Sequence, residues 1–454
     1  MSTQVPPLRR NRDFLLLWTG TAASNLGSYA SAVAYPLLVL ALTGSPADAG
    51  LTGFVALLPQ LLLQLPAGVL VDRYDRRRVM IWADVLRALA LGSLVLALLA
   101  GRLHLPHILA VGFVEGSMAV CYRIAAAAAI PHVVHSSQLT LAMSRNEIRV
   151  RGSAMLGQPL GGLLFGLGRA VPFLFDMLTY VASLCTLLLI RSDLQGDRGG
   201  ARRPNGIAEG VVWLWRQPFL RTTTLLIAGS NLLFGALVLV IIVIADGHGA
   251  SSSAVGVMLG LGAVGGVVGS LLSPAIKKRL PMNVVVIGAN WAWALLLPLL
   301  LLASGPYWLG AVFTLMSFIG PIWNIAISSY QLAITPDRIQ GRVLGASGMI
   351  AMGGVPLGPL VGGFLLEHVG ATVSLWVLAA WMLTLATAAT ASRSVRHAPA
   401  RPAEVPAGPA PTRRPLPAET PGDLPLDVRG RAGSAPPAGD LPPASAGPAA
   451  PSRA

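Results

Sequence analysis

Ionisable side chains inside long apolar stretches are costly and usually face a cavity or one another. Those of the first half of this sequence include Asp84, Arg87, Glu115, Arg123, Glu147, Arg149, Arg151 and Asp176. Asp84 and Arg87 are three residues apart, so on a helix they would share one face. We expect these two side chains to form a neutralising ion pair.

Glu115 is the residue of this set best placed for proton chemistry. It lies roughly nine residues, or about 13 Å along a helix, from the outer end of its apolar stretch. A carboxyl held there, away from water, can take up and release a proton. Glu115, with Arg123 and Glu147, is therefore the predicted site for proton coupling or for polar contact with a substrate. The alternative is a structural ion pair of Glu115 with Arg123 or Arg149. Asp84, Arg87 and Arg149 complete the predicted polar core.

The composition is that of a membrane protein, because 54% of the residues are hydrophobic and only 11% are charged, against about 25% charged in soluble domains. A helix needs about 20 apolar residues to cross about 30 Å of hydrocarbon. Twelve stretches are long enough, at residues 14–42, 48–71, 78–100, 106–131, 139–168, 170–191, 221–246, 252–276, 283–303, 306–334, 342–368 and 371–392. We therefore expect an all-α integral membrane protein with twelve transmembrane helices in two groups of six.

The apolar stretches divide the chain into five predicted segments. They are an N-terminal segment (1–13), a first six-helix bundle (14–191), a linker (192–220), a second bundle (221–392) and a tail (393–454). The tail is rich in Pro, Ala and Gly and is predicted to be disordered. Lys and Arg gather in alternate loops and in the tail, which predicts that both termini and the linker are cytoplasmic. Because the net charge of +14 is distributed in this way, it does not indicate a nucleic-acid partner.

The cysteines and the lack of a phosphate-loop motif exclude several kinds of site. The two cysteines, Cys121 and Cys185, lie in apolar stretches and are expected to be small buried side chains. They build neither a disulfide framework nor a cysteine-based zinc site, and we predict no metal and no cofactor. The sequence has no Gly-x-x-x-x-Gly-Lys phosphate loop, so an ion gradient is the expected energy source.

The two groups of six stretches carry an internal repeat, which is common in transporter folds. Ser24-Asn25-Leu26 recurs as Ser230-Asn231-Leu232. At an offset of 201 residues, Gly68, Leu70 and Arg76–Arg78 recur as Gly269, Leu271 and Lys277–Arg279. At an offset of 197, Arg145, Gly157, Pro159, Leu160 and Gly161 recur as Arg342, Gly354, Pro356, Leu357 and Gly358.

Two charged motifs between apolar stretches resemble those of a known family. The first has the pattern Gly-x-Leu-x-Asp-Arg-x-Gly-Arg-Arg, and its matching residues are Gly68, Leu70, Asp72, Arg73, Arg76 and Arg77, with Asp75 in place of the second glycine. The second is made by Pro336, Asp337, Arg338, Gly341 and Arg342. With Asn25-Leu26-Gly27, these motifs resemble the major facilitator superfamily over about residues 10–392. Within it they are similar to the bacterial branch of enterobactin exporters and macrolide efflux proteins.

The resemblance implies a cytoplasmic gate and a central cavity. By this resemblance a cytoplasmic latch would be formed by Gly68, Asp72, Arg73, Arg76 and Arg77. Asp72 would face the start of the eleventh stretch (342–368, called span 11 below), near Arg342. Ordinary topology-setting charge is the alternative. Substrate would lie between the halves, and the candidate cavity residues are Asn25, Asn231, Trp323, Asn324 and Tyr330.

A glycine-proline pattern in span 11 resembles a motif that the family associates with antiporters. It comprises Gly354, Gly358, Pro359, Gly362 and Gly363. Glycine removes side-chain bulk and proline frees a backbone carbonyl, so the pattern predicts a helix that can flex. Plain close packing of helices is the alternative.

These expectations combine into one predicted function. The chain would be a monomeric secondary active transporter in a bacterial inner membrane, exporting a small amphipathic compound such as a drug, antibiotic or siderophore. Its coupling ion would be a proton or sodium, and it would not be an enzyme. The alternatives are an importer of a small solute, a non-transporting sensor, or a lipid-modifying membrane enzyme, for which His132 and His135 offer the nearest candidate cluster.

Overall fold

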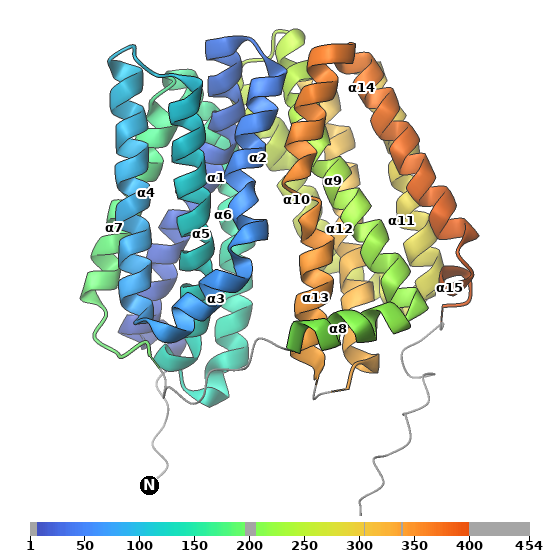
Figure 1. Ribbon diagram of the computed structural model, residues 1–454, viewed down its shortest axis with the longest axis horizontal. Helices are drawn as coiled ribbons and strands as arrows, with labels where there is room; N and C mark the ends of the chain where they lie inside the picture. The colour runs from blue at the N-terminus through green and yellow to red at the C-terminus, as the bar shows by residue number, and fades with distance from the viewer. Residues whose placement is uncertain (1–6, 196–205, 304, 337–338, 399–454) are drawn as a thin grey trace, which may run out of the picture. The chain divides into compact units, whose positions relative to one another are not determined.

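The computed structural model describes residues 7–195, 206–303, 305–336 and 339–398, and regular structure within these ranges is entirely helical. The first group of helices comprises α1 (Arg12–Thr43), α2 (Pro46–Leu62), α3 (Gln64–Arg73), α4 (Arg76–Leu99), α5 (Leu105–Val133), α6 (Leu139–Leu167) and α7 (Val171–Leu189). The second comprises α8 (Gly206–Arg216), α9 (Pro218–Gly247), α10 (Ser252–Arg279), α11 (Met282–Leu296), α12 (Pro306–Ile334), α13 (Gln340–Gly353), α14 (Leu357–Ala391) and the short α15 (Arg393–Arg396). Short 3-10 helices η1 (Leu8–Arg10), η2 (Ser136–Gln138) and η3 (Leu297–Leu302) complete the set (Figure 1).

The predicted twelve spans are confirmed, although several are not single uninterrupted helices. Within the described ranges, nine helices are long and apolar enough to cross a membrane, or ten if the bent pair α2–α3 is one span. α14 contains a turn at Gly370, where φ is 73°, and this turn separates the last two spans. α6 completes the twelve. Its first half carries several charged residues, which lower its hydropathy, namely Arg145, Glu147, Arg149 and Arg151.

Prolines account for the two broken spans. α2 ends at Leu62 and α3 leaves it at an angle of 58°. Pro66 has no N–H to bond to the carbonyl of Leu62, so the helix cannot continue straight through this point. Likewise α13 ends at Gly353 and α14 begins at Leu357, directly after Pro356. Span 11, predicted as a helix that can flex, is therefore interrupted at residues 354–356.

Two glycines of the span 11 pattern, Gly358 and Gly362, pack closely against α9. A Cβ at Gly358 would lie 2.6 Å from the Cα of Gly235, and one at Gly362 would lie 2.7 Å from the carbonyl oxygen of Ala236. Both contacts are with α9. For these two glycines the structure supports close packing, the alternative to flexing.

The two halves meet through two equivalent helix pairs, α6 with α10 and α2 with α14. A Cβ on Gly162 would lie 2.3 Å from the carbonyl oxygen of Ser252, in the first turn of α10. A Cβ on Gly363 would lie 2.5 Å from the carbonyl oxygen of Pro46, in the first turn of α2. These contacts lie at one end of the bundles, which we call the far end. The basic end is the other, where α1 and α4 begin with Arg12 and with Arg76–Arg78.

The contacts correct the predicted register of the repeat in spans 5 and 11. Gly157 approaches the carbonyl oxygen of Leu26, and Gly358 approaches that of Leu232, the repeat partner of Leu26. Gly157 therefore corresponds to Gly358, at an offset of 201 residues rather than 197. The predicted register was wrong by four residues, which is about one helical turn.

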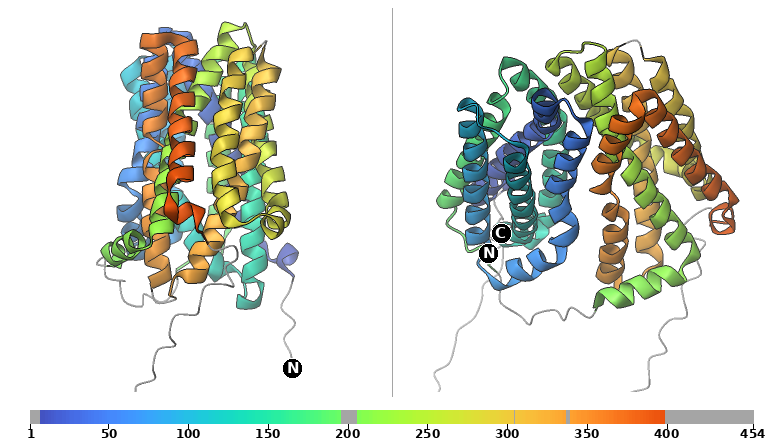
Figure 2. Two further views of the ribbon diagram at one scale, coloured as in Figure 1. Left: turned by 90° about the vertical axis from the view of Figure 1, so that its right-hand side faces the viewer. Right: turned by 45° about the horizontal axis from the view of Figure 1, so that its top comes forward.

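The segment predicted only as a polar linker contains the helix α8. This helix lies across the end of α13 at the basic end, as both views of Figure 2 show. A Cβ on Gly210 would lie 2.4 Å from the carbonyl oxygen of Arg342, and the Arg342 side chain pairs with Glu209. The rest of the linker at residues 196–205, and the predicted disordered tail from residue 399 onward, lie outside the described residues.

Candidate functional site

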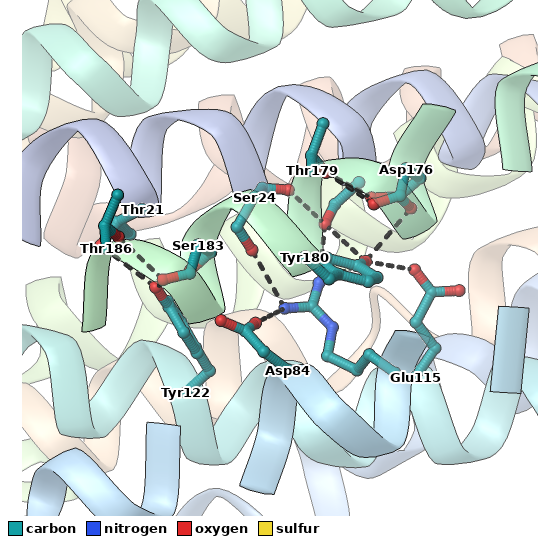
Figure 3. A network of polar contacts seen from close by, with 12 residues as sticks. Thr21, Ser24, Asp84, Glu115, Tyr122, Asp176, Thr179, Tyr180, Ser183 and Thr186 are labelled. Atoms are coloured by element: carbon teal, nitrogen blue, oxygen red, sulfur yellow. Dashed lines mark hydrogen bonds and ion pairs between the residues drawn. The ribbon is translucent and has the colours of Figure 1, made fainter. Parts of the chain in front are cut away.

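Five buried residues of the first half form a continuous polar cluster. Asp84 and Arg87 come from α4, Glu115 from α5, and Asp176 and Tyr180 from α7. We call these five residues the polar cluster, and Figure 3 shows how its acidic members and Tyr180 lie within the helices. Asp84 and Asp176 are fully buried, while Glu115 is 8% exposed. Spacings of three residues on α4 and four on α7 place each pair on one helix face.

Arg87 is the centre of the cluster. Its Nη2 donates to the Tyr180 hydroxyl at 2.6 Å and to the Ser28 hydroxyl at 2.7 Å, and its Nη1 donates to Ser24 at 3.2 Å. The guanidinium carbon lies 3.9 Å from the centroid of the Tyr180 ring, within the range of a cation–π contact. Nη1 also lies 3.7 Å from Asp84 Oδ1, so the predicted ion pair of Asp84 and Arg87 is formed.

Tyr180 links the two acidic groups on the other side of the cluster. Its hydroxyl lies 2.7 Å from Glu115 Oε1 and 3.1 Å from Asp176 Oδ2. A phenol has one proton to donate, so it can serve only one of these carboxyl groups at a time. Glu115 Oε2 accepts a second hydrogen bond, of 2.7 Å, from the hydroxyl of Tyr35 on α1. The carboxyl of Glu115 is thus held by two tyrosines.

The charge of the cluster is not balanced by its own members. Three carboxyl groups share one guanidinium, so the site carries excess negative charge unless protons are bound. Burying unpaired charge is strongly unfavourable. The arrangement is therefore chemically suited to holding at least one proton among Glu115, Asp176 and Asp84.

A cavity of about 470 Å³ adjoins the cluster. Glu115, Arg87 and Tyr35 line it, whereas Asp84, Asp176 and Tyr180 do not. Within the cluster, Glu115 is thus the carboxyl that the cavity reaches. Other polar lining residues are Thr21, Asn25, Ser28, Tyr29, Gln60, Tyr122, Arg123, Asn146 and Arg149.

A second cavity, of about 210 Å³, lies within the other half of the chain. Three of the predicted substrate residues line it, Asn231, Trp323 and Asn324, while Asn25 lines the first cavity. Tyr330 lines neither of these two cavities and packs edge-on against Phe219, with ring centroids 4.9 Å apart.

Several predicted polar contacts are not formed. Glu147 pairs with Arg151 at 2.8 Å, and these side chains are 60% and 45% exposed, so Glu147 lies outside the cluster. The alternative pairing of Glu115 with Arg123 or Arg149 is also absent among the described residues, because two tyrosines occupy the Glu115 carboxyl. Arg123 instead donates to Gln64 at 2.7 Å, and Arg149 to Asn146 at 2.8 Å.

The residues of the predicted gate do not meet across the two halves. Asp72 and Arg73 are exposed, and neither has a polar partner among the residues that the structure describes. A Cβ on Gly68 would meet no atom within 4 Å. Arg342, the gate candidate of the second half, is bound to Glu209. Asp337 and Arg338 of the second motif lie outside the described residues.

Arg76 and Arg77 instead tie together helices of the first half. Arg76 Nη1 donates to the carbonyl oxygens of Ala128 and Leu194, and Arg77 donates to those of Leu187 and Leu188. The last carbonyls of a helix have no partner within it and attract cations. Arg77 therefore satisfies the end of α7.

Sequence reasoning missed the two tyrosines and set Asp176 aside. Asp176 and Tyr180 are four residues apart in an apolar stretch, a spacing that would have indicated a shared polar face. Tyr35 gave no such signal. The expectation for cysteine was correct for Cys121, which is buried, and wrong for Cys185, which is exposed on its helix.

The chain is similar to known proteins over most of its length. A family model described as transmembrane secretion effector matches residues 2–409. The multidrug efflux pump Tap of Mycolicibacterium fortuitum is 27% identical over 398 residues, which cover 83% of this chain and 94% of Tap. Macrolide efflux protein A of Streptococcus pyogenes is 29% identical over 199 residues, which cover 43% of this chain and 49% of that protein.

Solved structures show the same fold at low identity. The nucleoside transporter NupG has a TM-score of 0.70 at 13% identity and covers 84% of this chain and 98% of its own. A bacterial homologue of the iron transporter ferroportin has a TM-score of 0.67 at 16% identity, covering 85% and 99%. With the family model spanning most of the sequence, the chain belongs to the transmembrane secretion effector family within the major facilitator superfamily.

Proposed function

We propose that this transporter exports small amphipathic organic compounds in exchange for protons. The observation that carries the proposal is the polar cluster, whose carboxyl group Glu115 opens onto a cavity large enough for an organic molecule. The relatives named as efflux pumps, Tap and macrolide efflux protein A, support export rather than import. A lipid-modifying enzyme has less support, since the His135 ring bonds to Ser137 within its own turn.

Proton exchange would use the shared hydrogen bonds of the cluster. A proton entering through the cavity would bind Glu115, and Tyr180 would then turn its own proton toward Asp176. Exchange would require that substrate leaves on the outer side before the proton binds, and that the proton leaves on the inner side before the next substrate binds. The excess of carboxyl groups over cations supports this assignment, because a bound proton relieves the unpaired buried charge of the cluster.

Replacing Glu115 with glutamine tests the assignment directly. Gln keeps the size and can still accept from Tyr35, but it cannot ionise. We expect proton movement driven by substrate to fall at least tenfold in everted membrane vesicles supplied with acidic, neutral and basic amphipathic compounds. Glu147→Gln is the matched control, because Glu147 is exposed and pairs with its neighbour Arg151. Unchanged proton movement in Glu115→Gln would contradict the proposal.

Alternating access would proceed by rocking of the two halves, with the termini in the cytoplasm as the basic loops indicate. Support comes from the glycine contacts of α6 with α10 and α2 with α14, which close the far end. Asp72 is exposed and has no polar partner within the described part of the chain, as expected for a latch that is open at the basic end. We infer that in the opposite state Asp72 accepts from the start of α13, where helix amides are free.

The latch makes a separate prediction about access from the cytoplasm. We expect Asp72→Asn to increase labelling of an Ala32→Cys variant from the basic end by about twofold to tenfold, because the closed basic end loses a charge-assisted contact. Ala32 lines the first cavity, and Cys121 and Cys185 would be replaced by serine beforehand. A membrane-impermeant maleimide measures the rate.

The matched control for the latch lies in the same loop. Asp75 caps α4 by accepting from the backbone N–H of Arg78, and asparagine caps a helix about as well as aspartate. Asp75→Asn should leave labelling unchanged. Equal labelling rates in the Asp72→Asn variant and the Asp75→Asn control would argue against the latch.

A further inference from the structure

The first cavity is lined by more cations than acids. Arg87, Arg123 and Arg149 line it together with one carboxyl group, that of Glu115. The polar cluster neutralises Arg87, because Asp84 lies beside it and Tyr180 connects it to Glu115 and Asp176. Arg123 and Arg149 remain as cations of the cavity wall without an acidic partner among the described residues.

Arg149 is the more informative of the two. It is 8% exposed, and its Nη2 donates to Asn146 Oδ1 at 2.8 Å. Its Nη1 is buried and has no hydrogen-bond partner within the described part of the chain. A buried guanidinium with an unused donor is costly, and such a group in a native protein commonly marks a place where a ligand binds.

The residues around Arg149 indicate which kind of ligand could bind to its Nη1 donor. Arg123 donates to the amide oxygen of Gln64, a neutral partner, and so adds positive charge to the lining of the same cavity. The wall also offers apolar surface, from Ala32, Leu57 and Val120, and the ring of Tyr29. A ligand with an acidic group on an apolar ring system would satisfy both features, since guanidinium binds carboxylate through strong, charge-assisted hydrogen bonds.

We propose that the first cavity binds amphipathic organic acids, with the carboxylate accepting from Arg149 Nη1 and the ring system against the apolar wall. This inference rests on the proposed export function and specifies its substrate class. Arg123 adds attraction for the anion within the same cavity. Arg87 is not needed for the acid, because the polar cluster already neutralises it.

The test compares two ligands that share one ring system, a carboxylate and its neutral amide. Binding of 2-naphthoate and of 2-naphthamide to the purified full chain in detergent micelles is measured by titration calorimetry. We expect 2-naphthoate to bind at least tenfold more tightly than the amide, and Arg149→Gln to remove this preference. Arg149→Lys retains the charge without the planar fork and should retain part of the preference.

Two controls separate a binding role from a structural one. Arg151→Gln removes a guanidinium two residues away that is exposed and paired with Glu147, and it should leave the preference intact. Arg149→Gln should not lower the thermal unfolding midpoint, because loss of the hydrogen bond to Asn146 is offset by removal of a buried donor that has no partner in the described structure. Equal binding of the two naphthalene ligands by the unmodified chain, or a preference that survives in Arg149→Gln, would overturn the inference.

The inference and the export function fail in different ways. If neutral or basic compounds drive proton movement in everted vesicles and 2-naphthoate neither binds nor drives it, the acid-binding inference is overturned and export stands. If 2-naphthoate binds in a manner that depends on Arg149 while no compound drives proton movement, the export function is wrong and the acid-binding inference stands.

Discussion

Replacing Arg87 with glutamine is expected to destabilise the first half of the chain and to abolish transport. The change leaves Asp84, Glu115 and Asp176 without their cation and removes donors to Tyr180. Breaking a buried ion pair by removing one partner costs about 3–5 kcal/mol. We expect a clear fall in the thermal unfolding midpoint of the purified protein, and no substrate-driven proton movement in proteoliposomes.

A second substitution distinguishes a charge effect from loss of packing. The double variant Arg87→Gln with Asp84→Asn removes one positive and one negative charge, so the net charge of the cluster is restored. Part of the lost stability should return, with a coupling energy of about 0.5–3 kcal/mol between the two sites. If the double variant is as unstable as Arg87→Gln alone, the shape of Arg87 matters more than its charge. A stable and active Arg87→Gln would refute the account of the cluster.

The spans could be predicted because hydropathy is a local property of the sequence. Each predicted stretch agrees within a few residues with one helix or a broken pair, for example 106–131 with Leu105–Val133. α6 was predicted despite its charges because its second half is apolar. The helix α8 was missed, since a short amphipathic helix that lies across another leaves no long apolar run.

The polar cluster could be predicted only where its residues share a helix. Asp84 and Arg87 are neighbours on α4, and their pairing follows from spacing alone. Glu115 was recognised as unusual, but its partners Tyr35 and Tyr180 are 80 and 65 residues away in the sequence. Which distant side chains meet depends on how helices pack, and a single sequence does not contain that information.

The error in the repeat register has a physical origin in small-residue packing. Glycines that allow close helix contact recur every four residues, so two such patterns match almost equally well when shifted by one turn. Gly157 can be aligned with Gly354 or with Gly358 on sequence alone. The contact with Leu26 on one side and Leu232 on the other decides for Gly358.

Replacing Gly162 with valine is expected to separate α6 from α10 at the far end. A side chain at this position would collide with the backbone of α10, because its Cβ alone would lie 2.3 Å from Ser252 O and 2.6 Å from Gly256 Cα. Overpacking costs about 1–3 kcal/mol. The collision occurs only while the two halves touch at the far end. The substitution therefore destabilises the state in which the far end is closed, and it leaves the stability of each half unchanged.

A cost of that size would shift the equilibrium from the state with the far end closed toward the state with the basic end closed by about 5–150-fold. We therefore expect Gly162→Val to move maleimide labelling of Ala32→Cys from the basic end to the far end. It should also slow transport, because the proposed alternating access would need a closed far end in every cycle. Gly166→Val is the matched control, one turn further along α6, where a Cβ would meet no atom within 4 Å. Both variants make the same glycine-to-valine change on α6, but only Gly162 approaches α10, so a difference in labelling is expected from that contact. If they label alike, the glycine contact does not hold the far end closed, and the proposed rocking of the two halves would have to be controlled elsewhere.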